Sequence, residues 1–143
     1  MNEHSFIRSI HKALHPDVYK WKIHDTYTGG VPDAMYAGPA GVLFVEYKYI
    51  PKLPKKNTTV IRHSLSSLQC AWLERMKHST NVALIVGSNN TGVIIQDDFS
   101  RNMCKYNYIE ENITKGEIAQ WIYNITFSGR AHENYRQITA SSN

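Results

Sequence analysis

The stretch GGVPDAMYAGPAGVLFVEYKYI, residues 29–50, decides the fold of this chain. Two apolar runs flank the turn-forming residues 38–41, and this pattern predicts a β-hairpin. The first run opens on Asp33, and the second carries Glu46 and Lys48 among apolar side chains. Charges in a buried strand are costly unless they pair with each other or bind a metal. The three charged residues therefore need an explanation.

The expected register of the hairpin brings these charges together. If the two glycines that bound the turn oppose each other, Asp33 opposes Glu46. Opposed residues project from the same face of a sheet, with Cβ atoms about 4.5–5.5 Å apart. Lys48 lies two residues beyond Glu46 and shares that face. A bulge at Pro39 would slip the register by one residue and turn Asp33 to the other face.

Two interpretations of this charged face remain open from the residues alone. Adjacent carboxylates repel each other, so the pKa of one rises unless a cation lies nearby. A buried ion pair from Lys48 to Glu46 or to Asp33 would supply that cation and would be purely structural. A divalent metal with oxygen ligands would also supply it, and Mg²⁺ prefers such ligands. Without further context the ion pair is favoured.

Apolar periodicity elsewhere predicts one α/β domain, a mixed sheet flanked by helices in the order αβββαβ. The core spans about residues 3–96, and a C-terminal extension spans about residues 97–143, with a polar tail from His132. Tryptophans 21, 72 and 121 are interpreted as core or helix-packing residues. The expected elements are a helix over 2–15, a strand over 18–25, the hairpin, a helix over 64–79 with Leu65, Leu68, Trp72 and Met76 on its apolar face, strands over 81–87 and 93–96, and a helix over 114–125.

Charge is distributed unevenly along the chain. The net charge is +4 and the pI about 9.1, but residues 47–73 contain five cations and no acid, a local excess that suits a phosphate backbone. These cations are Lys48, Lys52, Lys55, Lys56 and Arg62. The apolar runs are too short to span a bilayer and no signal-peptide core begins the chain, so a cytoplasmic protein without membrane contact is expected. No zinc-ligand spacing and no glycine-rich phosphate loop occurs.

The segments GVPD, FVEYK and LSSLQCAWLERM resemble the signature of PD-(D/E)xK nucleases, here of the virus-type replication-repair nuclease group (VRR-NUC). The resemblance covers about residues 3–87 and includes Glu3 before the apolar stripe of the first helix. Tyr47 departs from the apolar residue common between the glutamate and the lysine. The long basic loop departs as well, and so does the region after about residue 97.

The resemblance implies a Mg²⁺-dependent nuclease in which Mn²⁺ can substitute. It assigns Asp33, Glu46 and the Tyr47 carbonyl to the metal, and Lys48 to the attacking water. Gln69 would orient the water, the ligands or the phosphate, although its spacing from a serine three residues earlier equally makes a capping box. Glu3 would face the site, although an acid also suits a helix N-terminus.

The implied partner is DNA. A homodimer or higher homo-oligomer is compatible with the family. A viral or phage origin is compatible with it too, and would place the protein in the host cytoplasm. The substrate would be branched DNA or, alternatively, one defined sequence cut in the manner of a restriction or homing enzyme. The sequence is also compatible with a catalytically inactive binding module and with a structural protein that has a fortuitous ion pair. The backbone-contacting candidates are Lys22, Lys52, Lys55, Lys56 and Arg62, with His24 on the same strand face as Lys22.

Overall fold

The structure is a computed structural model and describes residues 1–25 and 27–128. Within those residues, a six-stranded sheet has the order β1-β2-β3-β5-β6-β8, in which β3 and β5 run parallel and the other neighbours antiparallel. The mixed sheet predicted from the sequence is confirmed. The elements are α1 Glu3–Ala13, β1 Tyr19–Lys22, β2 Ala34–Gly38, β3 Gly41–Tyr49, β4 Val60–Ile61, α2 Ser67–Met76, β5 Asn81–Ser88, β6 Thr91–Ile95, β7 Met103–Cys104, α3 Lys105–Glu111, β8 Ile113–Thr114 and α4 Lys115–Ser128.

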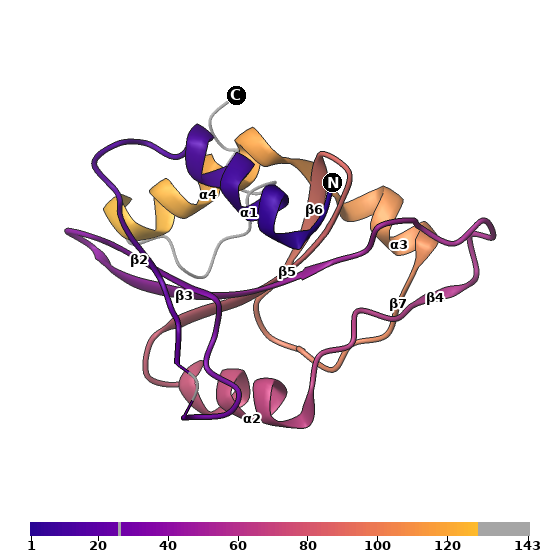
Figure 1. Ribbon diagram of the computed structural model, residues 1–143, viewed down its shortest axis with the longest axis horizontal. Helices are drawn as coiled ribbons and strands as arrows, with labels where there is room; N and C mark the ends of the chain where they lie inside the picture. Colours follow the sequence, from indigo (N-terminus) through magenta and orange to yellow (C-terminus); the bar gives the residue numbers. More distant parts are fainter. Residues whose placement is uncertain (26, 129–143) are drawn as a thin grey trace.

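Helices cover both faces of the central strands, as Figure 1 shows with α1 and α4 above the sheet and α2 below it. Phe6 of α1 and Trp121 of α4 are fully buried in one core cluster together with Val45 of β3. On the other face, Leu73 of α2 is buried, and Trp72 packs edge-on against Phe44 with ring centroids 5.3 Å apart. Residues of β3 that face opposite ways are therefore both enclosed, which explains its near-continuous apolar run.

Side-chain caps fix where the helices begin. The Thr114 hydroxyl accepts the N–H of Glu117, and the Glu117 carboxylate accepts the N–H of Thr114, as their spacing predicted. Asn2 and Ser5 make the same reciprocal pair at α1, so Glu3 is held in the first turn of that helix. No helix in the described part of the chain is long and apolar enough to cross a bilayer.

Two predictions about apolar side chains are wrong. Leu68 is 64% exposed, and the residue of α2 that is buried is Leu73. Leu68 lies in the first turn of α2 beside Gly29, where a Cβ would lie 2.8 Å from its side chain. Trp21 is 50% exposed because β1 is the edge strand of the sheet. Of the three tryptophans, Trp121 is buried as predicted and Trp72 packs against a strand as predicted.

The chain after residue 97 contributes elements that periodicity did not predict. The basic loop contains β4, which pairs antiparallel with β7, and α3 follows β7 directly. Two-residue strands carry too little pattern to be recognised in a sequence. The polar tail from His132 lies outside the described residues.

Candidate functional site

The hairpin has the register that the turn glycines predicted. Gly38 opposes Gly41, and Ala34 opposes Val45. Continuing this register by one residue sets Asp33, just before β2, opposite Glu46. The turn contains two residues and no bulge, and Gly41 adopts a φ of +150° that other residues rarely reach. Asp33 and Glu46 therefore share the face of the sheet that α2 covers.

Glu46 is the buried charge of this face, with 3% of its surface exposed. Its Oε2 lies 3.5 Å from Lys48 Nζ and accepts a hydrogen bond of 3.1 Å from Gln69 Nε2. Its Oε1 is buried and has no hydrogen-bond partner among the described residues. Burial, and then the negative charge of Asp33, raise the pKa of Glu46 to about 8 even though Lys48 lowers it. One side of the carboxyl is held by Gln69, and the other faces Asp33, whose hydrogen bond to the protonated form raises the Glu46 pKa further.

Pro32 and Asp33 end the β2–β3 ladder, whose last pair is Ala34 with Val45. The register sets Pro32 opposite Tyr47, where an ordinary residue would exchange both backbone hydrogen bonds with it. Proline has no N–H to donate. Asp33 Oδ2 accepts the Tyr47 N–H at 2.8 Å. The Tyr47 carbonyl therefore lacks the amide donor that any other residue at position 32 would offer.

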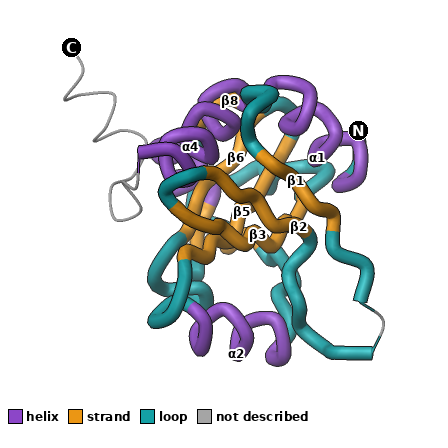
Figure 2. Tube along the Cα trace, turned by 90° about the vertical axis from the view of Figure 1, so that its left-hand side faces the viewer, coloured by secondary structure: helices purple, strands orange, loops and turns teal. Residues whose placement is uncertain are grey.

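Gln69 makes the capping box that its spacing predicted and also contacts Glu46. Its Oε1 accepts the Ser66 N–H at 2.9 Å and its own N–H donates to Ser66 Oγ, which completes the capping box of α2. Its Nε2 donates to Glu46. Gly30, with a φ of +85°, lets the preceding loop reach this helix end, since a Cβ there would lie 2.4 Å from the Leu68 carbonyl oxygen. Figure 2 shows this loop descending beside α2.

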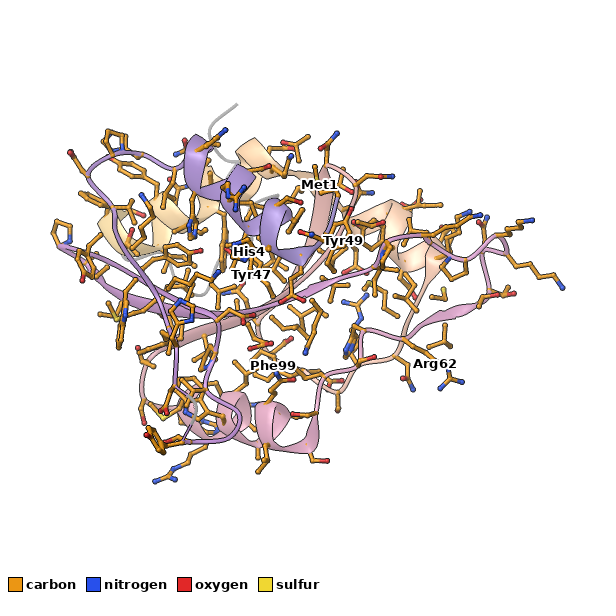
Figure 3. All side chains as sticks on the ribbon, viewed as in Figure 1. Met1, His4, Tyr47, Tyr49, Arg62 and Phe99 are labelled. Carbon is orange, nitrogen blue, oxygen red and sulfur yellow. The ribbon has the colours of Figure 1, made fainter. Side chains whose placement is uncertain are left out.

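Glu3 and Lys22 approach the site from the side of α1. Burial, and then the charge of Asp33, raise the pKa of Glu3, whereas Lys48 and Lys22 lower it. Lys22 Nζ also lies 2.8 Å from Nδ1 of His4, a residue of the first turn of α1 that Figure 3 labels. The structure therefore groups Asp33, Glu46, Lys48 and Gln69 by direct contacts or register, and Glu3 by electrostatic coupling.

A second polar group lies on the opposite face of β3, under α1. The Tyr47 hydroxyl lies 2.6 Å from the Tyr36 hydroxyl, which lies 2.8 Å from His11 Nε2. Burial, and then Lys20 and Lys22, lower the pKa of His11 to about 4, so its ring is neutral at pH 7. Figure 3 labels Tyr47 between α1 and the sheet, where Phe6 packs against its ring. This network gives the tyrosine between Glu46 and Lys48 a structural role.

The donor atoms at the carboxylate face suit a hard cation. Among residues 1–25 and 27–128, no three His, Cys, Asp or Glu side chains gather in a metal-binding group. Mg²⁺ does not need three such groups, because it is commonly bound through one or two carboxylates with waters and substrate phosphates. Asp33 and the unpaired oxygen of Glu46 offer such oxygens. These residues fit a divalent cation of that kind.

Comparison with solved structures relates this arrangement to a known fold. The 1.6 Å structure of Hjc from Archaeoglobus fulgidus, a Holliday junction resolvase from an archaeal hyperthermophile, matches with a TM-score of 0.52 and 12% sequence identity. The match covers 82% of this chain and 96% of that chain. The chain shares the fold of that protein. No family model and no curated protein matches the sequence.

The predicted backbone-contacting cations of the basic loop lie outside the carboxylate cluster of this resolvase-like fold. The loop is tied to later residues, since the Lys105 N–H donates to the Thr59 carbonyl and Lys105 Nζ to the Lys55 carbonyl. Figure 3 shows Arg62 beside β4, well to one side of Tyr47. This loop carries the exposed residues Lys52, Lys55, Lys56 and Arg62.

His63 is a neighbour of the site that sequence reasoning missed. Its Nδ1 accepts the Leu65 N–H at 3.2 Å. Burial, and then the positive charge of Lys48, lower its pKa. A single histidine outside any ligand spacing gave no signal in the sequence, and only the return of the chain from β4 towards α2 brings it near Lys48.

Proposed function

We propose that this chain is a metal-dependent DNA endonuclease that hydrolyses phosphodiester bonds in branched DNA. The observation that carries the proposal is the Glu46 carboxyl, buried opposite Asp33 with one oxygen to which no group of the described residues donates a hydrogen bond. A carboxylate buried only for a structural ion pair needs its remaining lone pairs satisfied as well. A cation shared with Asp33 would satisfy them. The likeness in fold to a Holliday junction resolvase supports branched DNA as the substrate class.

Asp33, Glu46 and the main-chain carbonyl of Tyr47 are the proposed metal ligands. The loss of the ladder donor at Pro32 supports the carbonyl as the third ligand. Mg²⁺ is the proposed ion, with Mn²⁺ as a substitute, because all three donors are oxygens. When bound, such an ion supplies Lewis-acid stabilisation of phosphate charge and lowers the pKa of water.

Lys48, Gln69 and Glu3 are proposed to act around these ligands. The Lys48 ammonium, 18% exposed beside Glu46, would hold the attacking water and offset charge on the phosphate. Gln69 holds one oxygen of Glu46 and would leave the other available to the ion. Glu3 would add negative charge at the α1 side. Water attacks phosphorus in line, the bond to the 3′ oxygen breaks, and a proton passes to that oxygen, leaving a 5′-phosphate.

DNA binding is proposed to extend from this centre in two directions. The basic loop would contact phosphates on one side, and Lys22 would contact them near the start of α1. Contacts of this kind position the backbone and do not read bases. A homodimer is the proposed assembly for cutting two equivalent strands of a junction, because twofold symmetry in the substrate matches twofold symmetry in the protein.

The test is a panel of end-labelled linear, flap and four-way-junction DNAs incubated with Mg²⁺. We expect preferential cleavage of the junction, with Lys48→Ala reducing the rate by at least about 100-fold. Lys12→Ala, which removes an exposed lysine from α1, is the matched control and should cut normally. Full Mg²⁺-dependent cleavage by Asp33→Asn would disprove the site. Cutting at one linear sequence would favour a sequence-specific enzyme. Tight binding without any cutting would favour an inactive binding module.

A further inference from the structure

The edge strand β1 carries two exposed aromatic side chains, Tyr19 and Trp21, which we call the β1 aromatic face. Tyr19 is 61% exposed and Trp21 50% exposed. Large aromatic side chains usually bury most of their area, so two of them exposed on a four-residue strand form an unusual surface. Neither residue has a role in the proposed chemistry.

The β1 aromatic face lies on the side of the sheet that carries Asp33 and Glu46. Trp21 opposes Met35, and the next residue pair along β1 brings the Ile23 N–H to within 2.8 Å of the Asp33 carbonyl. Opposed residues project from the same face, so Trp21 shares the face of Asp33 and lies one diagonal step from it, roughly 7–8 Å between Cα atoms. Helix α2 packs on β5 further along the sheet, and so leaves β1 exposed.

Cations alternate with these aromatics along the strand. Lys20 opposes Tyr36 and Lys22 opposes Ala34, so both project to the face opposite Trp21. The edge strand thus offers aromatic rings for base stacking on one face and lysines for phosphate contacts on the other. Proteins that bind single-stranded nucleic acid combine these two contacts, and stacking tolerates any base because every base has a π face.

A second copy of the chain is the competing occupant of this edge, because an edge strand can pair with another strand. Two β1 strands paired side by side would set Lys20 and Lys22 of both copies close together, and like charges across a strand pair are unfavourable. Lysines on an edge strand are a common device against such pairing. The same lysines favour a nucleic-acid strand.

We propose that Trp21 stacks on an unpaired nucleobase beside the scissile phosphate, with Tyr19 extending the stacking surface. This inference rests on DNA as the proposed substrate but does not need cleavage. Branch points and gaps offer unstacked bases, whereas a fully paired linear duplex offers none within its length. Trp21 would thereby select branched DNA by its structure, without reading sequence.

The test measures binding in EDTA, where no cutting occurs, by fluorescence anisotropy with two DNAs of equal length. One is a four-way junction with two unpaired thymines at the branch, and the other is a fully paired duplex. Trp21→Ala should weaken junction binding about 5- to 100-fold and duplex binding less than about twofold. Trp21→Phe should retain most of the affinity. Lys20→Ala is the control, since a lost phosphate contact should weaken both DNAs alike.

A 2-aminopurine at the unpaired position gives a direct signal, because stacking on Trp21 should quench its fluorescence and Trp21→Ala should restore it. Equal weakening of both DNAs by Trp21→Ala, or no weakening, would overturn the inference. A change from dimer to monomer in sedimentation of Trp21→Ala, with an unaltered DNA preference, would also overturn it. That result would assign the β1 aromatic face to a second copy of the chain. Selective binding without cleavage in Mg²⁺ would reject the proposed endonuclease and leave the stacking inference standing.

Discussion

Strand β3 carries polar side chains on both faces, and the two groups differ in how many of their polar atoms have hydrogen-bond partners. Under α1, the Tyr47 hydroxyl pairs with Tyr36, which pairs with His11. Over α2, Glu46 has one oxygen bonded to Gln69 and near Lys48, and the other is buried with no hydrogen-bond partner among the described residues. Tyr36, Tyr47 and Glu46 are all buried, so burial alone does not distinguish the two groups.

The two groups differ in their charge and in whether every polar atom has a hydrogen-bond partner. A neutral network that is hydrogen-bonded throughout can be buried at little cost and makes the core more specific. A carboxylate with an unpaired oxygen costs several kcal/mol to keep ionised in the interior. The group under α1 therefore behaves as a support for the strand, and the group over α2 as a site suited to a cation. Substitutions on the two faces should separate stability from activity.

Glu46→Gln should have the largest effect, a loss of junction cleavage of about 1000-fold or more, because a neutral amide is a poor ligand for a divalent ion. Tyr47→Phe changes the adjacent residue but keeps its main chain, and should cut within about threefold of the original rate. Single-turnover rates in saturating Mg²⁺ measure both. Similar losses in the two variants would remove the distinction between the faces.

The same Glu46→Gln variant should gain stability in the metal-free protein at alkaline pH. The folded pKa of Glu46, about 8, lies above its ordinary value of 4.5, so the folded state holds the proton more tightly than the unfolded state does. The free energy of unfolding therefore falls as pH rises from about 4.5 to about 8. Glutamine does not ionise and escapes this loss.

Thermal melts in EDTA should therefore show Glu46→Gln about 5–10 °C above the original protein at pH 8.5, with little difference at pH 5. Adding Mn²⁺ at pH 8.5 should raise the melting temperature of the original protein and leave the variant unchanged, because the ion binds the folded state alone. A difference independent of pH would mean that the Glu46 carboxyl is not the group responsible.

Local rules predicted the parts of the fold that depend on near neighbours. The turn glycines and the alternation of the hairpin determined the register, and the Ser66–Gln69 spacing determined the start of α2. The exposure of Trp21 depends on which strand lies at the sheet edge, a property of the whole topology. The pairing of β4 with β7 joins two-residue strands far apart in the chain, which no local pattern reveals. Both misses concern surfaces where DNA is proposed to bind.

Gln69→Glu should separate the two roles of that residue and have an intermediate effect. A glutamate completes the capping box as well as glutamine does, so the helix and its stability should be preserved. The amide that donates to Glu46 becomes a carboxylate that repels it. We expect cleavage to fall about 30-fold while the melting temperature at pH 7 changes by less than about 3 °C. Ser66→Ala, which removes the cap alone, should lower the melting temperature and leave cleavage nearly unchanged. If both variants lose activity in parallel, Gln69 acts only through the helix.

Tyr36→Phe should have the smallest effect on activity and act on stability instead. It removes the hydroxyl that joins Tyr47 to His11, and leaves the buried Tyr47 hydroxyl and the half-buried His11 Nε2 without that partner. An unsatisfied buried group costs about 1–3 kcal/mol, so urea denaturation should show a lower midpoint with an unchanged slope. Junction cleavage at 25 °C should remain within about threefold, because the main chain of Tyr47 is still held by Asp33. Cleavage that falls as far as in Glu46→Gln, in protein that is still folded, would show that the two faces act as one unit.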